Sequence, residues 1–268
     1  MRLFNLLLSI CLLAGLSLNS HAQEDSLSIN KKKRNHFIIG ATSAYTLSLI
    51  GLNELWYKDF PRQEFHFFDD SKEWKQMDKF GHTLSTYQIS RLSYQAISNI
   101  GLSERKSFLW SGAVGLLFMT PIEILDGFSA EYGASASDLL FNLGGATLFV
   151  GQGLLWKEQR LYPKYSFQRS NLASKRPNVL GSNLVEEFIK DYNGINYWLS
   201  ADIYKFLKNE SKFPKWLNLA IGYGANDMIY ADNTSNKLAG YSSYRQYYLG
   251  LDFDLTHIHT KSKIIKGL

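Results

Sequence analysis

The chain has 268 residues, a formal net charge of +5, 45% hydrophobic residues and 15% aromatic residues. This length is sufficient for one or two hydrophobic cores. The basic residues are not gathered with aromatic residues as in a nucleic-acid site, so nucleic acid is excluded as an expected partner.

Residues 1–22 have the pattern of a signal peptide. A basic start precedes the apolar run LFNLLLSICLLAGLSL, and Ser20 and Ala22 are the small residues that cleavage needs. An uncleaved anchor helix is the alternative. The one cysteine, Cys11, lies inside the apolar run after Ile10, so we expect no lipid attachment and no disulfide or thiolate metal site after cleavage. We predict an exported protein of the cell envelope, periplasmic or membrane-associated, and leave the choice between inner and outer membrane open.

A basic linker is predicted next, over residues 23–35, where the run KKKRNH begins. This run is either a contact for anionic lipid or a solvated stretch of charge. A helical bundle domain is predicted over residues 36–162. Its four long helices are expected at residues 37–57, about 75–100, 105–128 and 135–158.

Three of these helices are apolar enough to approach the length of a membrane span, whereas the helix at 75–100 carries many polar residues along one side. The pattern fits a membrane bundle with one polar helix packed against the others, or a water-soluble bundle with very apolar inner helices. The expected fold class is mainly α: a four-helix membrane-associated bundle followed by a small antiparallel β module.

The β module is predicted over residues 195–268, after a linker at 163–194 that holds a short amphipathic helix. Three stretches in the module alternate apolar and polar residues with the period of a strand. Three strands are too few to close a barrel. They leave a sheet edge, to which an envelope protein partner can bind.

Three pairs of polar residues stand out in the apolar helices. Asp78 and His82 are four positions apart, and so are Asp138 and Asn142, while Glu123 and Asp126 are three apart. Each pair therefore shares one helix face. Because burying such groups alone is costly, we expect the pairs to meet at a common interior point.

This cluster has three possible roles. It can be a catalytic site, in which a carboxylate orients His82 as a general base. It can hold a divalent metal by oxygen and imidazole ligands, although no cofactor is established. It can also be an internal polar network that fixes helix packing. The candidate catalytic residues are Asp78, His82, Glu123 and Asp138, and the candidate metal ligands are Asp78, His82 and Glu123.

Two stretches, MDKFGH and PIEILDGFSAEYGASASDLLFNLGG, carry a resemblance to a known family. Between Asn53 and Trp156 the chain resembles the YfiM-like predicted periplasmic lipoproteins, a domain of unknown function. The second stretch is also similar to VanZ-like membrane proteins. Their pattern is matched here by Glu123, Asp138, Asn142 and Gly145. An early motif that both families share is matched by Asp78, Lys79 and His82.

The chain departs from the VanZ-like pattern in two places. Asp126 stands where that pattern has a glutamine, and the usual arginine has no counterpart near Glu131 and Tyr132. The resemblance implies an envelope location and the positions of a site, without a reaction. It adds Lys79, Asp126, Asn142 and Gly145 as candidate binding residues.

Two functions are therefore expected. The first is a binding or structural component of the envelope, with membrane lipid as a partner. The alternative is a membrane-embedded hydrolase or transferase that acts on a lipid or cell-wall precursor, with or without a metal. No nucleophile elbow, phosphate-binding loop or HExxH motif is present in the sequence, which favours the first.

Overall fold

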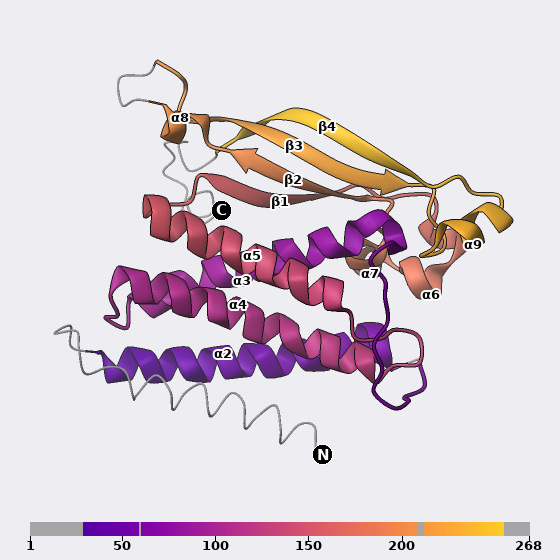
Figure 1. Cartoon of the computed structure of the whole chain (residues 1–268), viewed down its shortest axis with the longest axis horizontal. Coiled ribbons are helices and arrows are strands. Elements are labelled where there is room, and N and C mark those ends of the chain that lie inside the picture. The colour runs from indigo at the N-terminus through magenta and orange to yellow at the C-terminus, as the bar shows by residue number, and fades with distance from the viewer. Residues whose placement is uncertain (1–28, 59, 208–211, 255–268) are drawn as a thin grey trace. The chain divides into compact units, whose positions relative to one another are not determined.

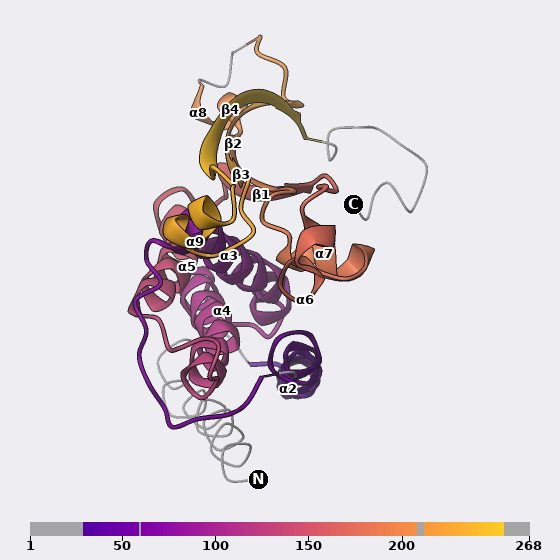
Figure 2. The same ribbon diagram turned by 90° about the vertical axis from the view of Figure 1, so that its right-hand side faces the viewer.

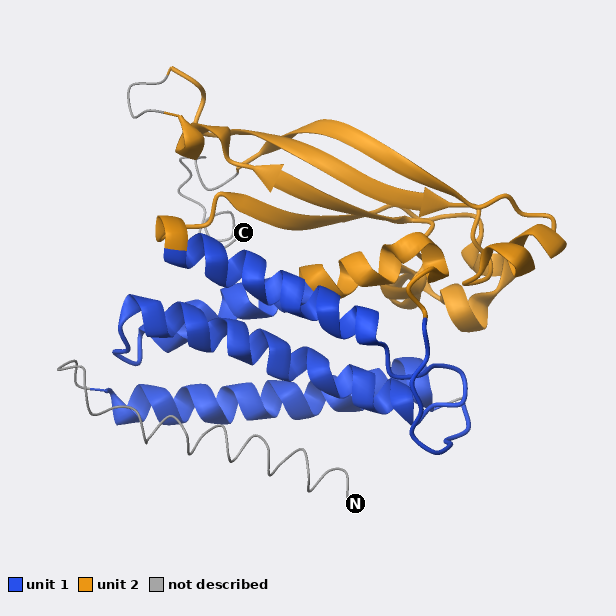
Figure 3. Ribbon diagram, in the orientation of Figure 1, with its two compact units in different colours: residues 1–69, 85–154 blue, residues 70–84, 155–268 orange. Residues whose placement is uncertain are grey.

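The structure is a computed structural model, and it describes residues 29–58, 60–207 and 212–254. The chain divides into two compact units. Unit 1 comprises residues 1–69 and 85–154, and unit 2 comprises residues 70–84 and 155–268 (Figure 3). The predicted export signal lies outside the described residues.

Unit 1 is helical and begins with α2 (Lys31–Leu52), which a five-residue π-helix, Asn53–Tyr57, extends (Figure 1). The Asn30 side chain caps α2 by accepting a hydrogen bond from the backbone N–H of Lys33 (3.0 Å). The helix therefore starts inside the basic stretch that we predicted as a linker. The cap explains why a helix can begin here. It satisfies a free backbone N–H group in a first turn whose positive charges are unfavourable at the N-terminal end of the helix dipole.

The division between the units runs through α3 (Met77–Ser98), whose first two turns belong to unit 2. Unit 1 continues with α4 (Glu104–Gly127) and α5 (Ala136–Trp156), of which the last two residues belong to unit 2. Buried aromatic rings join the helices of unit 1. Tyr94 stacks on Phe108 with ring centroids 4.3 Å apart, and Phe149 packs against both rings.

Unit 2 contains a four-stranded antiparallel sheet in the order β1-β2-β3-β4. Its strands are β1 (Leu161–Phe167), β2 (Ile195–Ala201), β3 (Leu217–Asn226) and β4 (Tyr244–Phe253). Figure 2 shows how strongly this sheet is curved. Side chains alternate between its two faces, and one face is apolar across the β3–β4 pair, where Ile221 is opposite Leu249.

Short helices lie between the strands of unit 2. They are α6 (Pro177–Leu180), α7 (Leu184–Lys190), α8 (Ile203–Phe206) and α9 (Asn233–Leu238). The core of the unit is a cluster of buried residues from the start of α3, the sheet and the loop after β3: Met77, Ile195, Tyr197, Ala225 and Met228.

The coarse fold class is confirmed: long helices come first and an antiparallel sheet follows. One strand was missed, because β1 lies in the segment 163–194 and just before it, where we predicted a linker. The compact units also group residues 70–84 with the sheet rather than with the helices. Membrane association stays a prediction.

Candidate functional site

The first two turns of α3 carry a buried charge network in unit 2. Lys79 is 1% exposed, and its Nζ lies 2.6 Å from Asp70 Oδ2 and 3.1 Å from Asp78 Oδ2. The other oxygen of Asp78 accepts a hydrogen bond from the Tyr192 hydroxyl (2.9 Å) and lies 3.8 Å from His82 Nε2. We call these five residues the Lys79 cluster. A buried ammonium is tolerated here because two carboxylates face it.

The charges of the Lys79 cluster set the ionisation of Asp78. Burial opposes the charged form of this carboxyl, but the His82 imidazolium, the Lys79 ammonium and the Tyr192 hydrogen bond outweigh it and hold the pKa of Asp78 below its usual range. Both oxygens of Asp78 have partners within unit 2. The arrangement in this unit is therefore that of a paired charge network.

Glu73, one turn before α3, has the opposite shift. Burial, together with the negative charge of Asp70, raises the pKa of Glu73 to about 7. A carboxyl with this pKa changes its charge near neutral pH.

The turn that leads into α3 has an unusual backbone. Trp74, Lys75 and Gln76 have φ values of 45°, 53° and 65°, in the left-handed region that residues other than glycine rarely occupy. Contacts from the sheet side of unit 2 hold the turn: the Tyr223 hydroxyl donates to the Lys75 carbonyl, and Arg245 donates to the Gln76 side chain (2.5 Å). This turn fixes where α3 begins and so where the Asp78 side chain lies.

A second polar cluster lies in unit 1. Glu123 is 3% exposed, and its Oε2 accepts the backbone N–H of Ser135 (3.1 Å). The Ser135 hydroxyl in turn accepts the N–H of Asp138 (3.1 Å), which caps the start of α5. Thr86 on α3 donates to Asn142 Oδ1 (3.0 Å). We call these five residues the Glu123 cluster.

Small residues let the helices of unit 1 approach closely enough for these bonds. Gly115 on α4 faces the Thr86 carbonyl, where an added Cβ would come within 2.7 Å of that oxygen. Gly112 faces Val150 on α5 in the same way, with 2.5 Å to a methyl group. Gly145, a predicted binding residue, is buried on α5 one turn after Asn142. Such close contacts between glycine and a neighbouring helix are typical of tightly packed bundles.

Asp126 has a partner outside the Glu123 cluster. Its Oδ1 accepts the Tyr57 hydroxyl at 2.7 Å. Burial, with the charge of Asp126, raises the pKa of Tyr57 far above its usual range. The phenol therefore stays protonated and keeps donating this hydrogen bond, which ties the π-helix to the last turns of α4.

Helices α4 and α5 of unit 1 bury several polar and small residues and leave some large apolar residues exposed. On α5, Asp138, Asn142 and Gln152 are buried, whereas Leu140 is 64% exposed and Leu143 is 50% exposed. On α4, the buried residues include serines and glycines at its centre as well as Glu123. By length and composition α4 and α5 can each span a membrane, with mean hydropathy of 1.6 and 1.3, yet only 39% and 33% of these apolar windows are buried.

The structure thus brings the predicted residues together in two groups. Asp78, Lys79 and His82 meet in unit 2. In unit 1, Glu123 and Asp138 are linked through Ser135, and Asn142 is buried one turn after Asp138 on α5. The prediction of one common site joins residues of both units and stays a prediction. The same holds for the catalytic role, for the hydrolase or transferase alternative, and for a metal held by Asp78, His82 and Glu123.

Sequence reasoning missed four members of these clusters, one of which is Thr86, the donor to Asn142. Asp70 and Tyr192 are partners of Asp78 and Lys79, and Ser135 joins Glu123 to Asp138. Ser135 had a local signal, since a serine at the start of the predicted helix 135–158 with an acid three positions later is typical of a helix cap. Tyr192 had none, because it is 114 positions from Asp78.

Comparison with known proteins gives a partial match. Residues 64–151, less than half of the chain, match a family model described as "Predicted periplasmic lipoprotein (DUF2279)". The match fits an exported, envelope-associated protein of unknown activity. It includes every predicted site residue, while the YfiM name and the VanZ-like similarity stay predictions. The comparisons with curated proteins and with solved structures each gave no match.

Proposed function

We propose that this protein is an exported envelope component whose helical unit is seated in a lipid bilayer, and that it works by binding rather than by catalysis. The observation that carries the proposal is the distribution of residues on α4 and α5. Polar and glycine residues are buried on both helices beside the aromatic core of Phe108 and Phe149. Large apolar residues are exposed, one on α4 and several on α5: Leu109, Leu139, Leu140, Leu143, Leu154 and Leu155.

Water is an unfavourable environment for the exposed apolar residues of these helices. A fully buried leucine gains about 1.5 to 3 kcal/mol over an exposed one, so a chain that folds in water turns such residues inward. Here Leu139, Leu140 and Leu143 are 41%, 64% and 50% exposed on neighbouring turns of α5. Lipid chains are as apolar as leucine, so a bilayer removes this cost without any change in the fold.

The buried faces of α4 and α5 also fit a bilayer environment. In a bilayer, helices associate through small residues and through hydrogen bonds between polar side chains. Gly112 and Gly115 supply the close approach, and the Thr86–Asn142 hydrogen bond supplies the polar contact. Buried charge in the helices of unit 1 is held near one end of α5, where Ser135 connects Glu123 and Asp138.

The state of the candidate catalytic residues supports a binding role. Glu123 and Asp138 are each 3% exposed. The Glu123 carboxylate accepts the Ser135 backbone N–H, and the backbone N–H of Asp138 donates to the Ser135 hydroxyl. Asp78 uses both oxygens for Lys79 and Tyr192. A general acid or base must reach its substrate, whereas a paired internal network fixes how helices pack.

Spin labelling tests the bilayer seating. In a chain with Cys11→Ser, single labels are placed by Leu140→Cys and Leu143→Cys, and the protein is reconstituted into liposomes. We expect high accessibility to oxygen and low accessibility to a water-soluble nickel chelate at both positions. The matched control is Glu104→Cys, which lies at the exposed start of α4 and should be accessible to the chelate.

The proposal fails if the labels at Leu140 and Leu143 are as accessible to the chelate as the label at Glu104. It also fails if the chain, in high salt and without detergent, stays in solution as a monomer that does not sediment with liposomes.

A further inference from the structure

Two connectors of unit 1 are joined into an ordered structure beyond the end of α4. The backbone N–H of Gln63 donates to the Phe128 carbonyl (3.0 Å), and that of Ala130 donates to the Pro61 carbonyl (3.0 Å). The Gln63 side chain adds a bond to the Ser129 carbonyl (3.3 Å). These bonds join segments more than 60 positions apart and so fix the walls between them.

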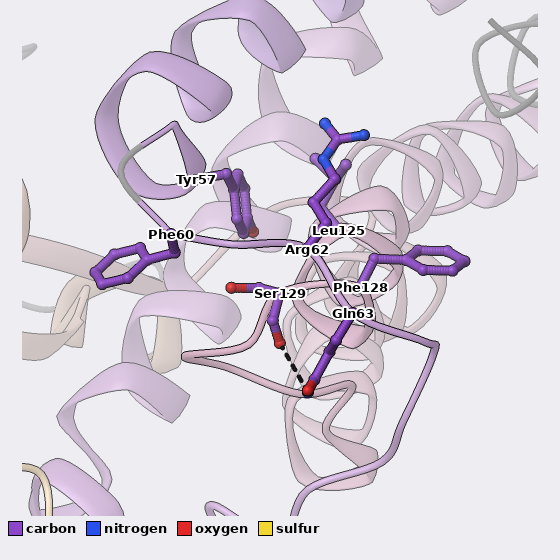
Figure 4. Close-up of a pocket in the computed structure, with 7 residues that line it drawn as sticks. All are labelled: Tyr57, Phe60, Arg62, Gln63, Leu125, Phe128 and Ser129. Carbon is purple, nitrogen blue, oxygen red and sulfur yellow. Dashed lines mark hydrogen bonds between the residues drawn. The ribbon is translucent and has the colours of Figure 1, made fainter.

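A pocket of about 220 Å³ lies between these connectors and the last turns of α4 (Figure 4). Its walls are mainly apolar, formed by the rings of Tyr57, Phe60 and Phe128 and by Leu125. The volume is below the roughly 300 Å³ at which pockets for whole drug-sized ligands begin. The pocket therefore suits one part of a larger molecule.

The charged group of the pocket is Arg62. Its backbone pairs with Ser129 as an isolated bridge, while its side chain is exposed. Figure 4 shows the guanidinium on one side of the pocket and the Gln63 side chain on the other. Among the residues that the structure describes, no carboxylate pairs with this guanidinium, and Asp126, which follows the pocket residue Leu125, accepts from Tyr57. Five N–H donors are therefore available for an anion.

Further aromatic side chains follow Arg62 and Gln63 on the same connector. Phe65, Phe67 and Phe68 are 44%, 71% and 46% exposed. Aromatic rings gather at the level of lipid headgroups, where apolar bodies and polar edges are both accommodated. If α4 is seated in a bilayer, the pocket at its end lies at that level.

We infer that this pocket binds an anionic amphiphile, with a phosphate group on Arg62 and the apolar part next to it among Tyr57, Phe60 and Phe128. This inference rests on the proposed binding function and names its ligand class. A phosphate can come from a lipid headgroup or from free phosphate, and the apolar walls distinguish the two, because only an amphiphile uses them.

Calorimetry on the full chain in a neutral detergent tests the inference without a bilayer. The probes are a short-chain phosphatidylglycerol, a short-chain phosphatidylcholine and inorganic phosphate. We expect phosphatidylglycerol to bind at least about tenfold more tightly than either of the others. Arg62→Gln should weaken its binding about 10- to 100-fold, as expected for loss of a charged hydrogen bond.

Two further variants keep the test specific. Arg91→Gln removes an exposed arginine of α3 and should leave binding unchanged. Phe60→Ala should weaken the binding of both lipids, because it removes part of the apolar wall of the pocket. Equal affinity for the two lipids, or unchanged binding by Arg62→Gln, would overturn the anion site. If inorganic phosphate bound as tightly as phosphatidylglycerol, the inference that the ligand is an amphiphile would be overturned. The spin-label experiment does not involve this pocket, so each proposal can fail by itself.

Discussion

The two units bury polar groups in different ways. In unit 2, charge is balanced by charge: Lys79 is enclosed by Asp70 and Asp78 beside a core of Met77, Ile195 and Met228. In unit 1, the Lys58–Glu54 ion pair is at the surface. The interior holds Glu123 and Asp138, which bond to Ser135, together with the neutral Thr86–Asn142 hydrogen bond and close glycine contacts. The two units thus differ in how they hold buried polar groups: unit 2 pairs opposite charges, and unit 1 relies on hydrogen bonds and close helix contacts.

The largest expected effect is on the charge network. Lys79→Met removes the ammonium that both Asp70 and Asp78 contact. Breaking a buried ion pair costs about 3 to 5 kcal/mol, and we expect about 3 kcal/mol because the two carboxylates are 16% and 28% exposed. Urea unfolding measures the loss. Lys58→Met, which removes the exposed pair, should change the free energy of unfolding by less than about 0.5 kcal/mol. Equal effects would remove the distinction between the units.

The next effect is on helix contact in unit 1. Gly115→Ala places a methyl group against the Thr86 carbonyl, and overpacking of this kind costs about 1 to 3 kcal/mol. Gly151→Ala is the matched control, because its Cβ meets nothing within 4 Å. That control should stabilise α5 by up to about 1 kcal/mol. Thermal unfolding in detergent measures both, and a Gly115→Ala variant as stable as Gly151→Ala would contradict the close packing.

A smaller effect is expected at the neutral hydrogen bond. Thr86→Val removes the donor to Asn142 at nearly constant shape, and we expect a loss of about 1 kcal/mol. Thr120→Val, on the exposed side of α4, should have little effect on the same thermal scan. A loss as large as that of Lys79→Met would mean that unit 1 depends on its polar groups as strongly as unit 2 does.

The smallest effect concerns pH. Below about pH 4.5 Glu73 is protonated in the folded and unfolded states, and above its folded pKa of about 7 it is ionised in both. Because the folded state favours the protonated form, the free energy of unfolding should fall as the pH rises between these values. Glu73→Gln should flatten that decline in urea unfolding at a series of pH values. If the variant showed a decline of the same slope, the decline would belong to another titratable group.

Periodicity located the long helices well, because each has an extended apolar face and clear ends. The expected helix at 105–128 is α4 at Glu104–Gly127, and that at 135–158 is α5 at Ala136–Trp156. The strand β1 was missed because Pro163 interrupts its pattern. Proline is tolerated there because β1 is an edge strand of the sheet.

The site was predicted only as far as local spacing reaches. That Asp78 and His82 share a face follows from the helix period, and so does the pairing of Asp138 with Asn142. The partners that decide the chemistry, such as Tyr192, come from distant parts of the chain. No single-sequence pattern reports such contacts, because the fold alone brings these residues together.

The left-handed turn at 74–76 has a consequence for the order of assembly. Its conformation is held by Tyr223 and Arg245, which follow it by about 150 positions in the chain. During synthesis or export these residues emerge last, so the beginning of α3 cannot be fixed until β3 and β4 have formed. Proteolysis of nascent or truncated chains should therefore cut near this turn until the final strand is available.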